Sequence, residues 1–451
     1  MPHSSDVERR PSSATGERRG PPVQLPFAVT AALPGTYLGA AGYLGLPHPD
    51  LAAPLAAAVF GIAIIGAAFV LSWAAEAAQV DISAGLAIAV LAVVAVLPEY
   101  AVDLVFTYQA GQLYAEQGTC VAGDGGANPC SLALANMTGA NRVLVGFGWP
   151  LVVLVASIAT LRAHRESRST HPGRVALAPA MSAEVVFLGM ATLYSLTLPL
   201  RSSLTMIDAA VFVAIFAGYA WRLSKAPTEE PDLVGVAAWL GHKPKARRRG
   251  TVIGLFAVAG LFILATAEHF AENLVDTGKH LGVDEFLLVQ WVAPLASESP
   301  ELIVACLYAV RLKASHSLGT LLSSKVNQWT LLVGTIPIVF ALSATTTDGL
   351  PLDTHQRFEL LITAAQSLFA VSVLVNLGLT ASGAATLFVL FAVQFTASIV
   401  LPADTNRVII VVLSVLYAVL AVGQFVRRRR DTARIVRDGI ATPFTDLTDG
   451  R

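Results

Sequence analysis

Two glutamates one helical turn apart, Glu298 and Glu301, flank Pro300 inside an otherwise apolar stretch. A second proline-glutamate step, Pro98-Glu99, stands in an earlier apolar stretch, and Asp103 follows Glu99 by one helical turn. A carboxylate at membrane depth is costly and normally faces a cavity or a partner, so it predicts a functional site. Proline frees backbone carbonyl oxygens beside the kink that it makes. Carboxylate and carbonyl oxygens together suit a hard cation such as Ca²⁺, Na⁺ or Mg²⁺.

The composition predicts an all-α, polytopic membrane protein. Of 451 residues, 55% are hydrophobic and only 14% are charged, which lies outside the soluble globular range. The formal net charge of −1 gives no reason to expect a nucleic-acid partner. The chain has no phosphate loop, metalloprotease motif or nucleophile elbow, so we expect a protein that is not an enzyme and has no resident cofactor.

The apolar stretches predict about twelve transmembrane helices, because a helix needs about 20 residues to cross the hydrocarbon. The candidate spans are Leu25–Leu46, Leu51–Ala75, Ile82–Gly111, Ser131–Leu161, Ser182–Leu200, Ser203–Leu223, Thr251–Thr277, Val283–Val310, Ser315–Ala344, Phe358–Leu379, Ser382–Leu401 and Arg407–Val426.

Positively charged residues predict the topology, since Lys and Arg prefer short cytoplasmic loops. With the amino terminus inside, the expected spans place the basic segment 225–250 and the Arg427–Arg430 run in the cytoplasm. We therefore expect a multi-pass protein of the plasma (inner) membrane with both termini cytoplasmic. The loop with Cys120 and Cys130 then lies outside, where a disulfide would persist; the sequence leaves open whether one forms.

These spans divide the chain into successive regions. They are a disordered cytoplasmic tail (1–24), an extra membrane span (25–50), a first repeat (51–224), a cytoplasmic linker (225–250), a second repeat with a final span (251–426) and a basic cytoplasmic tail (427–451). By the expected topology, the two Pro-Glu spans cross the membrane in opposite directions. We therefore predict two inverted five-helix repeats, which in transporters meet at a midplane site and operate by alternating access.

At these residues the sequence resembles the cation/calcium antiporter superfamily, the sodium/calcium exchanger-like membrane proteins. That family carries a Gly-Thr-Ser-Leu-Pro-Glu motif on one helix of each repeat and a Gly-Asn-x-x-Gly-Ser-Asn motif on the next. The first motif corresponds to Val94–Glu99 and Ala296–Glu301, and the second to Ala135–Asn141 and Gly319–Lys325. The resemblance extends from about Leu51 to Phe425.

The chain departs from the family motifs at several positions. Ala95 and Val96 replace the hydroxyl residues that help to hold sodium in the family, which weakens a sodium-coupled interpretation. The second repeat keeps Ser297 but has Glu298 where the family has a serine. Lys325 stands where the family has its final asparagine. We expect Lys325 either to balance the charge of Glu298 or Glu301 or to bind backbone carbonyls.

The predicted cation-binding residues are Glu99, Glu301, Glu298, Asp103, Asn136 and Ser297, with Glu99 and Glu301 as the metal ligands and Asn136 included on the resemblance alone. Burial and like charges favour neutral carboxyl groups, so the four acids would not all be ionised together. A site of this kind exchanges protons for cations.

Other charged residues lie outside the predicted cation site. Glu268 and Glu272 recur with Asp276 on one helix face, and are interpreted as an acidic outer vestibule or as a solvated helix end. Arg142 and Glu359 are interpreted as anchors at the membrane interface.

We therefore predict a cation antiporter that exchanges Ca²⁺ or Na⁺ for protons. Its partners would be inorganic cations, protons and the lipid bilayer, and a homo-oligomer is compatible with the sequence. Two alternatives stay open: a sodium-coupled calcium exchanger, and a non-transporting membrane scaffold or membrane enzyme with a decayed ion site.

Overall fold

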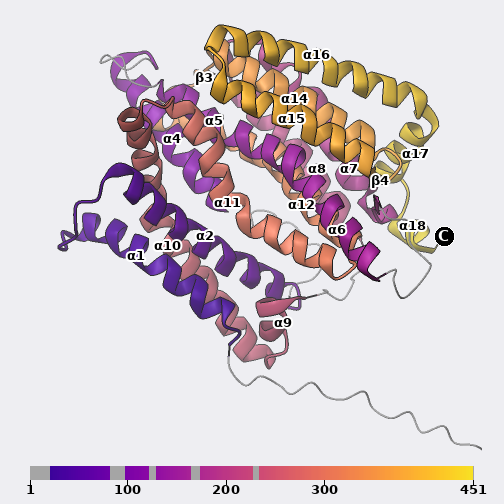
Figure 1. The fold of residues 1–451 in the computed structure, drawn as a ribbon, viewed down its shortest axis with the longest axis horizontal. Coiled ribbons are helices and arrows are strands. Elements are labelled where there is room, and N and C mark those ends of the chain that lie inside the picture. Colours follow the sequence, from indigo (N-terminus) through magenta and orange to yellow (C-terminus); the bar gives the residue numbers. More distant parts are fainter. Residues whose placement is uncertain (1–20, 82–96, 121–127, 164–172, 227–232, 450–451) are drawn as a thin grey trace, which may run out of the picture.

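The fold is that of a computed structural model, which describes residues 21–81, 97–120, 128–163, 173–226 and 233–449 (Figure 1). The long helices are α1 (Gln24–Leu44), α2 (Ala53–Ala78), α4 (Leu97–Gln117), α5 (Pro129–Val143), α6 (Trp149–Ala163), α7 (Ser182–Ser195), α8 (Met206–Leu223), α10 (Lys245–Leu281), α11 (Glu285–Val310), α12 (Ala314–Asn327), α13 (Val333–Ala344), α14 (Thr354–Leu374), α15 (Ala381–Val400), α16 (Ala403–Arg427) and α17 (Arg429–Ile440). Shorter helices are η2 (Pro179–Met181), η3 (Leu198–Leu200), α9 (Gly235–Gly241) and α18 (Phe444–Asp449).

Within the described ranges, 9 helical segments are long and apolar enough to cross a membrane. They coincide with nine of the expected spans, and α1 and α11 lie at the positions of two more. α4 covers the second part of the expected span Ile82–Gly111, whose residues 82–96 lie outside the described ranges. The protein is therefore a multi-pass helical membrane protein, as predicted, while the total of about twelve spans stays a prediction.

Two π-helical segments mark the internal repeat. α5 continues through η1 (Leu144–Gly148) into α6, and α12 continues through η4 (Gln328–Leu332) into α13. Isolated π-helical turns are rare and recur at functional sites. The same interruption therefore follows the second motif in both halves of the chain.

Two short antiparallel sheets join the halves. β1 (Arg174–Ala176) pairs with β4 (Gly378–Thr380), and β2 (Ser203–Leu204) pairs with β3 (Leu350–Pro351). Each sheet combines one strand from each half, and the two sheets lie at opposite ends of the bundle (Figure 1). We call the end with β2 and β3 the disulfide face and the end with β1, β4 and α18 the terminal face.

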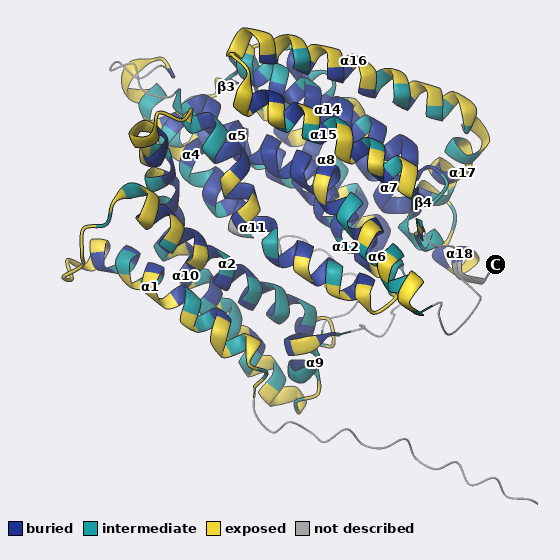
Figure 2. Cartoon of the chain, viewed as in Figure 1, coloured by how far each residue is buried: buried dark blue, intermediate teal, exposed yellow. Residues whose placement is uncertain are grey.

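Helices α1, α2 and α10 form a group with its own core. Their contacts are made mainly by small residues such as Ala32, Ala63, Ala67 and Ala259, which let the helices approach closely. The main core lies among α4 to α8 and α11 to α16, and it also includes Phe60 of α2 and Phe270 of α10. Figure 2 shows that α16 and the outer faces of α1 and α10 are exposed, and their exposed side chains are largely apolar, as expected of lipid-facing surfaces.

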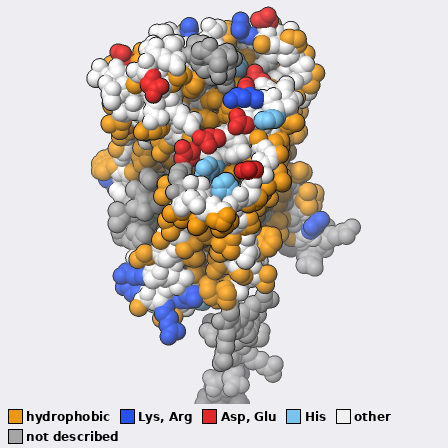
Figure 3. Space-filling model, turned by 90° about the vertical axis from the view of Figure 1, so that its left-hand side faces the viewer, with side chains coloured by type: hydrophobic (Ala, Val, Ile, Leu, Met, Phe, Trp, Pro, Cys, Tyr) orange, Lys and Arg blue, Asp and Glu red, His pale blue; other side chains and the backbone are white. Residues whose placement is uncertain are grey.

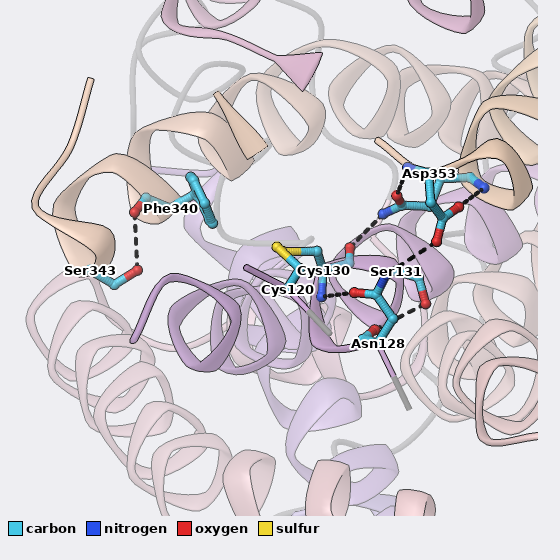
Figure 4. The surroundings of a disulfide bond; sticks show 8 residues. Cys120, Asn128, Cys130, Ser131, Phe340, Ser343 and Asp353 are labelled. Carbon is cyan, nitrogen blue, oxygen red and sulfur yellow. Dashed lines mark hydrogen bonds between the residues drawn. A yellow bond between two sulfur atoms is a disulfide. The ribbon is translucent and has the colours of Figure 1, made fainter. Parts of the chain in front are cut away.

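A disulfide closes the loop before α5. Cys120 and Cys130 are bonded on the disulfide face (Figure 4). Asn128 accepts a hydrogen bond from the Cys130 amide at 3.0 Å and donates to Asp353 at 3.3 Å. The disulfide loop is thereby attached to the start of α14, where Asp353 and Gln356 form a reciprocal capping box.

Two regions expected to be simple polar segments contain packed helices. The expected linker 225–250 contains α9, whose Val236, Ala237 and Leu240 are buried, and it also contains the first turn of α10. The expected basic tail forms α17 and α18, and α17 packs on α7. Both regions bury apolar side chains between their charges, which the interpretation as a solvated loop did not take into account. Most of the predicted tail 1–24 and Val94, Ala95 and Val96 lie outside the described residues.

Candidate functional site

The candidate site lies where α4 and α5 of the first half meet α11 and α12 of the second. In Figure 1, α11 runs through the middle of the bundle between the α2–α10 layer and the remaining helices. The contact between α5 and α11 depends on Gly139, because a Cβ atom there would lie 1.7 Å from the carbonyl oxygen of Gln290. This close approach brings the second motif of one half beside the first motif of the other.

Four buried carboxyl groups gather at this junction. Glu99 and Asp103 lie on α4, and Glu298 and Glu301 lie on α11; none is more than 8% exposed. Glu99 interacts electrostatically with Glu301 and Asp103, and Glu298 interacts with Glu99 and Glu301. The structure therefore brings together the four acids that the sequence analysis singled out.

Amide side chains hold two of these acids. Asn136 on α5 donates a hydrogen bond to Asp103 at 2.8 Å. Gln328, the first residue of the π-helical segment η4, donates to Glu298. The two contacts are arranged alike in the two halves. In the first half an acid of α4 binds an amide of α5, and in the second half an acid of α11 binds the amide that directly follows α12.

Several oxygens of the cluster have no hydrogen-bond donor among the described residues. They are both carboxylate oxygens of Glu99, one oxygen each of Asp103, Glu298 and Glu301, and the side-chain oxygen of Asn136. Ser297 is buried in the cluster, where its hydroxyl group interacts with Glu99 and also donates to the Ala293 carbonyl at 3.3 Å. Buried oxygens without donors are unfavourable unless a proton, a cation or water satisfies them.

The arrangement is not a ready-made metal cage. In the part of the chain that the structure describes, no three Asp, Glu, His or Cys side chains converge as ligands of one ion. The oxygens nevertheless form a hard donor set of the type that binds Ca²⁺ or Na⁺. The site thus offers acidic groups that protons and a transported cation can occupy in turn.

Lys325 is fully buried beside this cluster. Its ammonium group donates to the side-chain oxygen of Asn141 at 2.6 Å and to the Asn141 carbonyl at 3.1 Å. It also lies 4.9 Å from the centre of the Trp329 ring, and Glu298 is the carboxylate with which it interacts. Asn141 and Lys325 end the second motif in the two halves, so equivalent positions of the repeats contact each other.

A buried ion pair lies next to this contact. Arg142 and Glu359 are 2.6 Å apart and are 1% and 2% exposed. Gln290 donates to Glu359 at 2.9 Å, and Arg142 stacks over Trp291 at 4.7 Å. The interpretation of Arg142 and Glu359 as interface anchors was therefore wrong, because the two charges lie against each other inside the bundle and neither side chain is exposed.

The predicted vestibule residues lie apart from the four acids. Glu268 and Glu272 stand with Asp276 along one face of α10, in the part of the helix that ends at Leu281. Glu272 is 49% exposed. Figure 3 shows acidic side chains and histidines on the disulfide face.

Sequence reasoning missed Gln328 and Gln290. Both amides are fully buried and bind a glutamate. An amide inside an apolar stretch predicts a polar partner in the bundle, and Gln328 directly follows the second motif, so the signal was present.

The comparisons agree with this geometry. The pattern of the family described as "Sodium/calcium exchanger protein" matches residues 52–225 and 251–426, which are the two halves. The solved structure described as "Crystal Structure of H+/Ca2+ Exchanger CAX" is 39% identical with a TM-score of 0.81, over 95% of this chain and 98% of that chain.

A more distant structure, "Structure of native YfkE", is 14% identical with a TM-score of 0.57, over 84% of this chain and 100% of that chain, and shows the fold alone. No curated protein matches the chain. With both repeats matched by the family pattern, the chain belongs to the sodium/calcium exchanger protein family.

Proposed function

We propose that this membrane cation antiporter exchanges Ca²⁺ for protons at the Glu99–Glu301 cluster. The observation that carries the proposal is the group of buried carboxylate oxygens without donors on α4 and α11. The similar solved structure is described as an H+/Ca2+ exchanger, which supports both ions.

Competition for the same oxygens explains the exchange. When the four carboxyl groups open to one side, a calcium ion replaces their protons and neutralises them with hard oxygen ligands. When they open to the other side, protons displace the ion. Glu99 and Glu301 would bind the cation, while Asp103 and Glu298, each held by an amide, would tune the site or pass protons.

Alternating access requires one part of the bundle to move against another. The small-residue cluster that α1, α2 and α10 share supports a group that moves together, with Phe60 and Phe270 joining it to the main core. A groove of about 530 Å³ lies between α2, α10 and α11 and is lined by Gly61, Phe270 and Ala296 among others. Movement of the group along α11 would expose the carboxylates to either side.

Lys325 would reduce the negative charge of the site whenever its amino group is protonated. Its contact with Asn141 keeps it near Glu298 without neutralising that carboxylate directly. Replacing Lys325 by Met would remove a positive charge close to the binding site. We expect the KM for calcium to fall, because the cation would then meet less repulsion.

The orientation follows from the charges at the two faces. Arg248, Arg249 and the arginines of α17 lie towards the terminal face, and the disulfide lies on the other. We propose that the terminal face is cytoplasmic and that the membrane is the plasma (inner) membrane, because basic residues stay inside and disulfides persist outside.

Proteoliposomes with an imposed pH gradient test the function. We expect calcium uptake that follows the proton gradient, needs no sodium and collapses when a protonophore is added. Glu301→Gln should abolish it. Glu184→Gln makes the same change in a buried glutamate of α7 outside the site, and should leave uptake near the wild-type rate.

Uptake that survives Glu301→Gln would disprove the site assignment. Uptake that requires a sodium gradient would favour the sodium-coupled alternative, and absence of flux for every group I and group II cation would favour a non-transporting protein.

A further inference from the structure

The arginine-rich helix α17 presents a charged surface that has no role in the proposed ion exchange. Between Arg427 and Ile440 the chain has six arginines and two aspartates, a net charge of +4. Such a run is usually only a signal for topology. Here, however, the run forms a helix that is held in a fixed orientation.

Arg222 fixes the carboxyl end of α17. This arginine, 5% exposed at the end of α8, donates to the carbonyl oxygens of Gly439 at 2.9 Å and Asp438 at 3.1 Å, and also to Thr442. Its guanidinium group stacks over Phe444 at 4.1 Å. These contacts satisfy carbonyls that a helix end would otherwise leave without donors.

The inner face of α17 packs tightly on α7. Ile435 and Gly439 are its buried residues, and a Cβ atom on Gly439 would lie 2.6 Å from Val186. Because Ile435 and Gly439 are one turn apart, they define the face that points to the bundle. The opposite face is therefore turned outward.

That outward face has two adjacent stripes. At about 100° per residue, Arg430, Arg434 and Arg437 fall on one stripe, and Val436 and Ile440 fall beside them. Arg434 and Arg437 lie 3.8 Å from Asp431 and 3.4 Å from Asp438, but their side chains are still 56% and 70% exposed. Val436 and Ile440 are 44% and 51% exposed. A basic stripe next to an apolar stripe is typical of a helix that lies in a membrane interface.

The position of α17 restricts what this face can meet. α17 begins directly after α16, an apolar span that ends at Arg427 (Figure 1). Because a span ends where the hydrocarbon ends, we expect the first turn of α17 at the level of the lipid headgroups. A positively charged stripe at this level is complementary to lipid phosphates, and the exposed Val436 and Ile440 match the boundary of the acyl chains.

We infer that α17 is a docking surface for anionic lipids of the leaflet on the terminal face. Arg430, Arg434 and Arg437 bind the headgroup phosphates, and Val436 and Ile440 enter the acyl boundary. Through Arg222 the lipid surface is connected mechanically to α8. α8 in turn contacts α12, the helix of Lys325, through a pair of hydroxyls, Tyr219 and Ser323, 3.2 Å apart.

A fluorescent label on the apolar stripe tests this inference. The full protein would carry V436C together with Cys306→Ala, and an environment-sensitive fluorophore would be attached to the introduced thiol, since Cys120 and Cys130 are bonded to each other. Doxyl-labelled phosphatidylglycerol or doxyl-labelled phosphatidylcholine, at equal mole fractions in vesicles, would quench the label. The ratio of the two quenching efficiencies measures local enrichment of anionic lipid.

We expect the label on V436C to be quenched by both lipids, with phosphatidylglycerol at least about threefold more effective at low salt. Salt at about 0.5 M should reduce the ratio, because headgroup attraction is screened. A label on D446C, on α18, should be quenched instead by aqueous iodide.

Two charge-matched variants separate this surface from general positive charge. Arg430→Gln, Arg434→Gln and Arg437→Gln together should bring the ratio close to one. Lys243→Gln, Lys245→Gln and Arg247→Gln, which remove as much charge near the start of α10, should leave it unchanged.

An equal fall of the quenching ratio in both triple variants would overturn the inference. A label on V436C that is quenched only by iodide would overturn it too. Energy transfer between labelled copies at low protein density would overturn it too, since it would show that a second copy of the chain covers this face instead of lipid. Transport by each variant in proteoliposomes verifies that it has folded.

Discussion

The buried pair Arg142–Glu359 allows a quantitative prediction about what holds the two halves together. The charged atoms are 2.6 Å apart and the side chains are 1% and 2% exposed, so water solvates neither charge appreciably. Removing one partner of such a pair leaves an uncompensated buried charge, which costs about 3 to 5 kcal/mol. We expect Glu359→Gln to lower the free energy of unfolding by about that amount.

The double variant Arg142→Met with Glu359→Gln removes both charges and keeps an amide acceptor for Gln290. Because this double variant leaves no buried charge without a partner, we expect its free energy of unfolding to fall by only about 1 to 2 kcal/mol. The coupling energy from the double-mutant cycle should therefore be at least about 2 kcal/mol, and the effects of the single variants should not add.

The assay is equilibrium unfolding of the full chain in mixed lipid–detergent micelles, followed by tryptophan fluorescence. Arg201→Met is the matched control, since Arg201 and Asp208 are also 2.6 Å apart but Arg201 is 39% exposed. Asp208 retains bonds from Tyr194 and Thr205 after that change. We expect this control to lower the free energy of unfolding by no more than about 1 kcal/mol.

A Glu359→Gln variant whose free energy of unfolding lies within about 0.5 kcal/mol of the wild-type value would refute the reasoning, because an inert surface substitution usually has an effect of that size. Additive single variants would refute it as well, since they would show that the two charges do not depend on each other.

Three further changes test other parts of the fold. Asp81 receives two hydrogen bonds from Arg248, at 2.7 and 2.8 Å, which are the main reason that the pKa of Asp81 lies below its ordinary value. Because the folded pKa of Asp81 is lowered, its stabilisation of the fold is complete at neutral pH and is lost only below about pH 4. Asp81→Asn should therefore lower the thermal midpoint at pH 7 by an amount equivalent to about 1 kcal/mol. An unchanged midpoint would contradict this. Gly139→Ala should reduce both stability and calcium uptake, since the new methyl group would meet the Gln290 backbone, and normal uptake by a stable variant would contradict the close approach. Cys120→Ser should destabilise the protein by about 2 to 3 kcal/mol by opening the disulfide loop, whereas reducing agent should have no effect on the stability of the variant.

The sequence was sufficient for the class of fold and for the acids of the candidate site. Span positions depend on runs of apolar residues, which are local properties of the chain, and the described helices occupy those positions. Glu99 and Glu301 were recognised because a carboxylate beside a proline is unusual in an apolar stretch. Their burial together follows once the two halves are inverted relative to each other.

Other features were decided only by tertiary structure. Lys325 had two interpretations from its sequence context, and the rotation and depth of α12 against α5 are what direct its ammonium group to Asn141. Arg142 and Glu359 are far apart in the chain, and hydropathy alone cannot distinguish an arginine near a membrane surface from one with a buried partner.

The same distinction applies to the carboxyl-terminal segment. Its arginines predicted a basic cytoplasmic tail, because charge is read residue by residue from a sequence. Whether such a segment docks depends on a complementary surface elsewhere in the chain, here Arg222 and the face of α7 around Val186. The sequence by itself therefore determined which segments are apolar enough to span a membrane and which four acids gather at the candidate site, because both are written in local patterns. Packing between distant helices decided which partner each buried charge has.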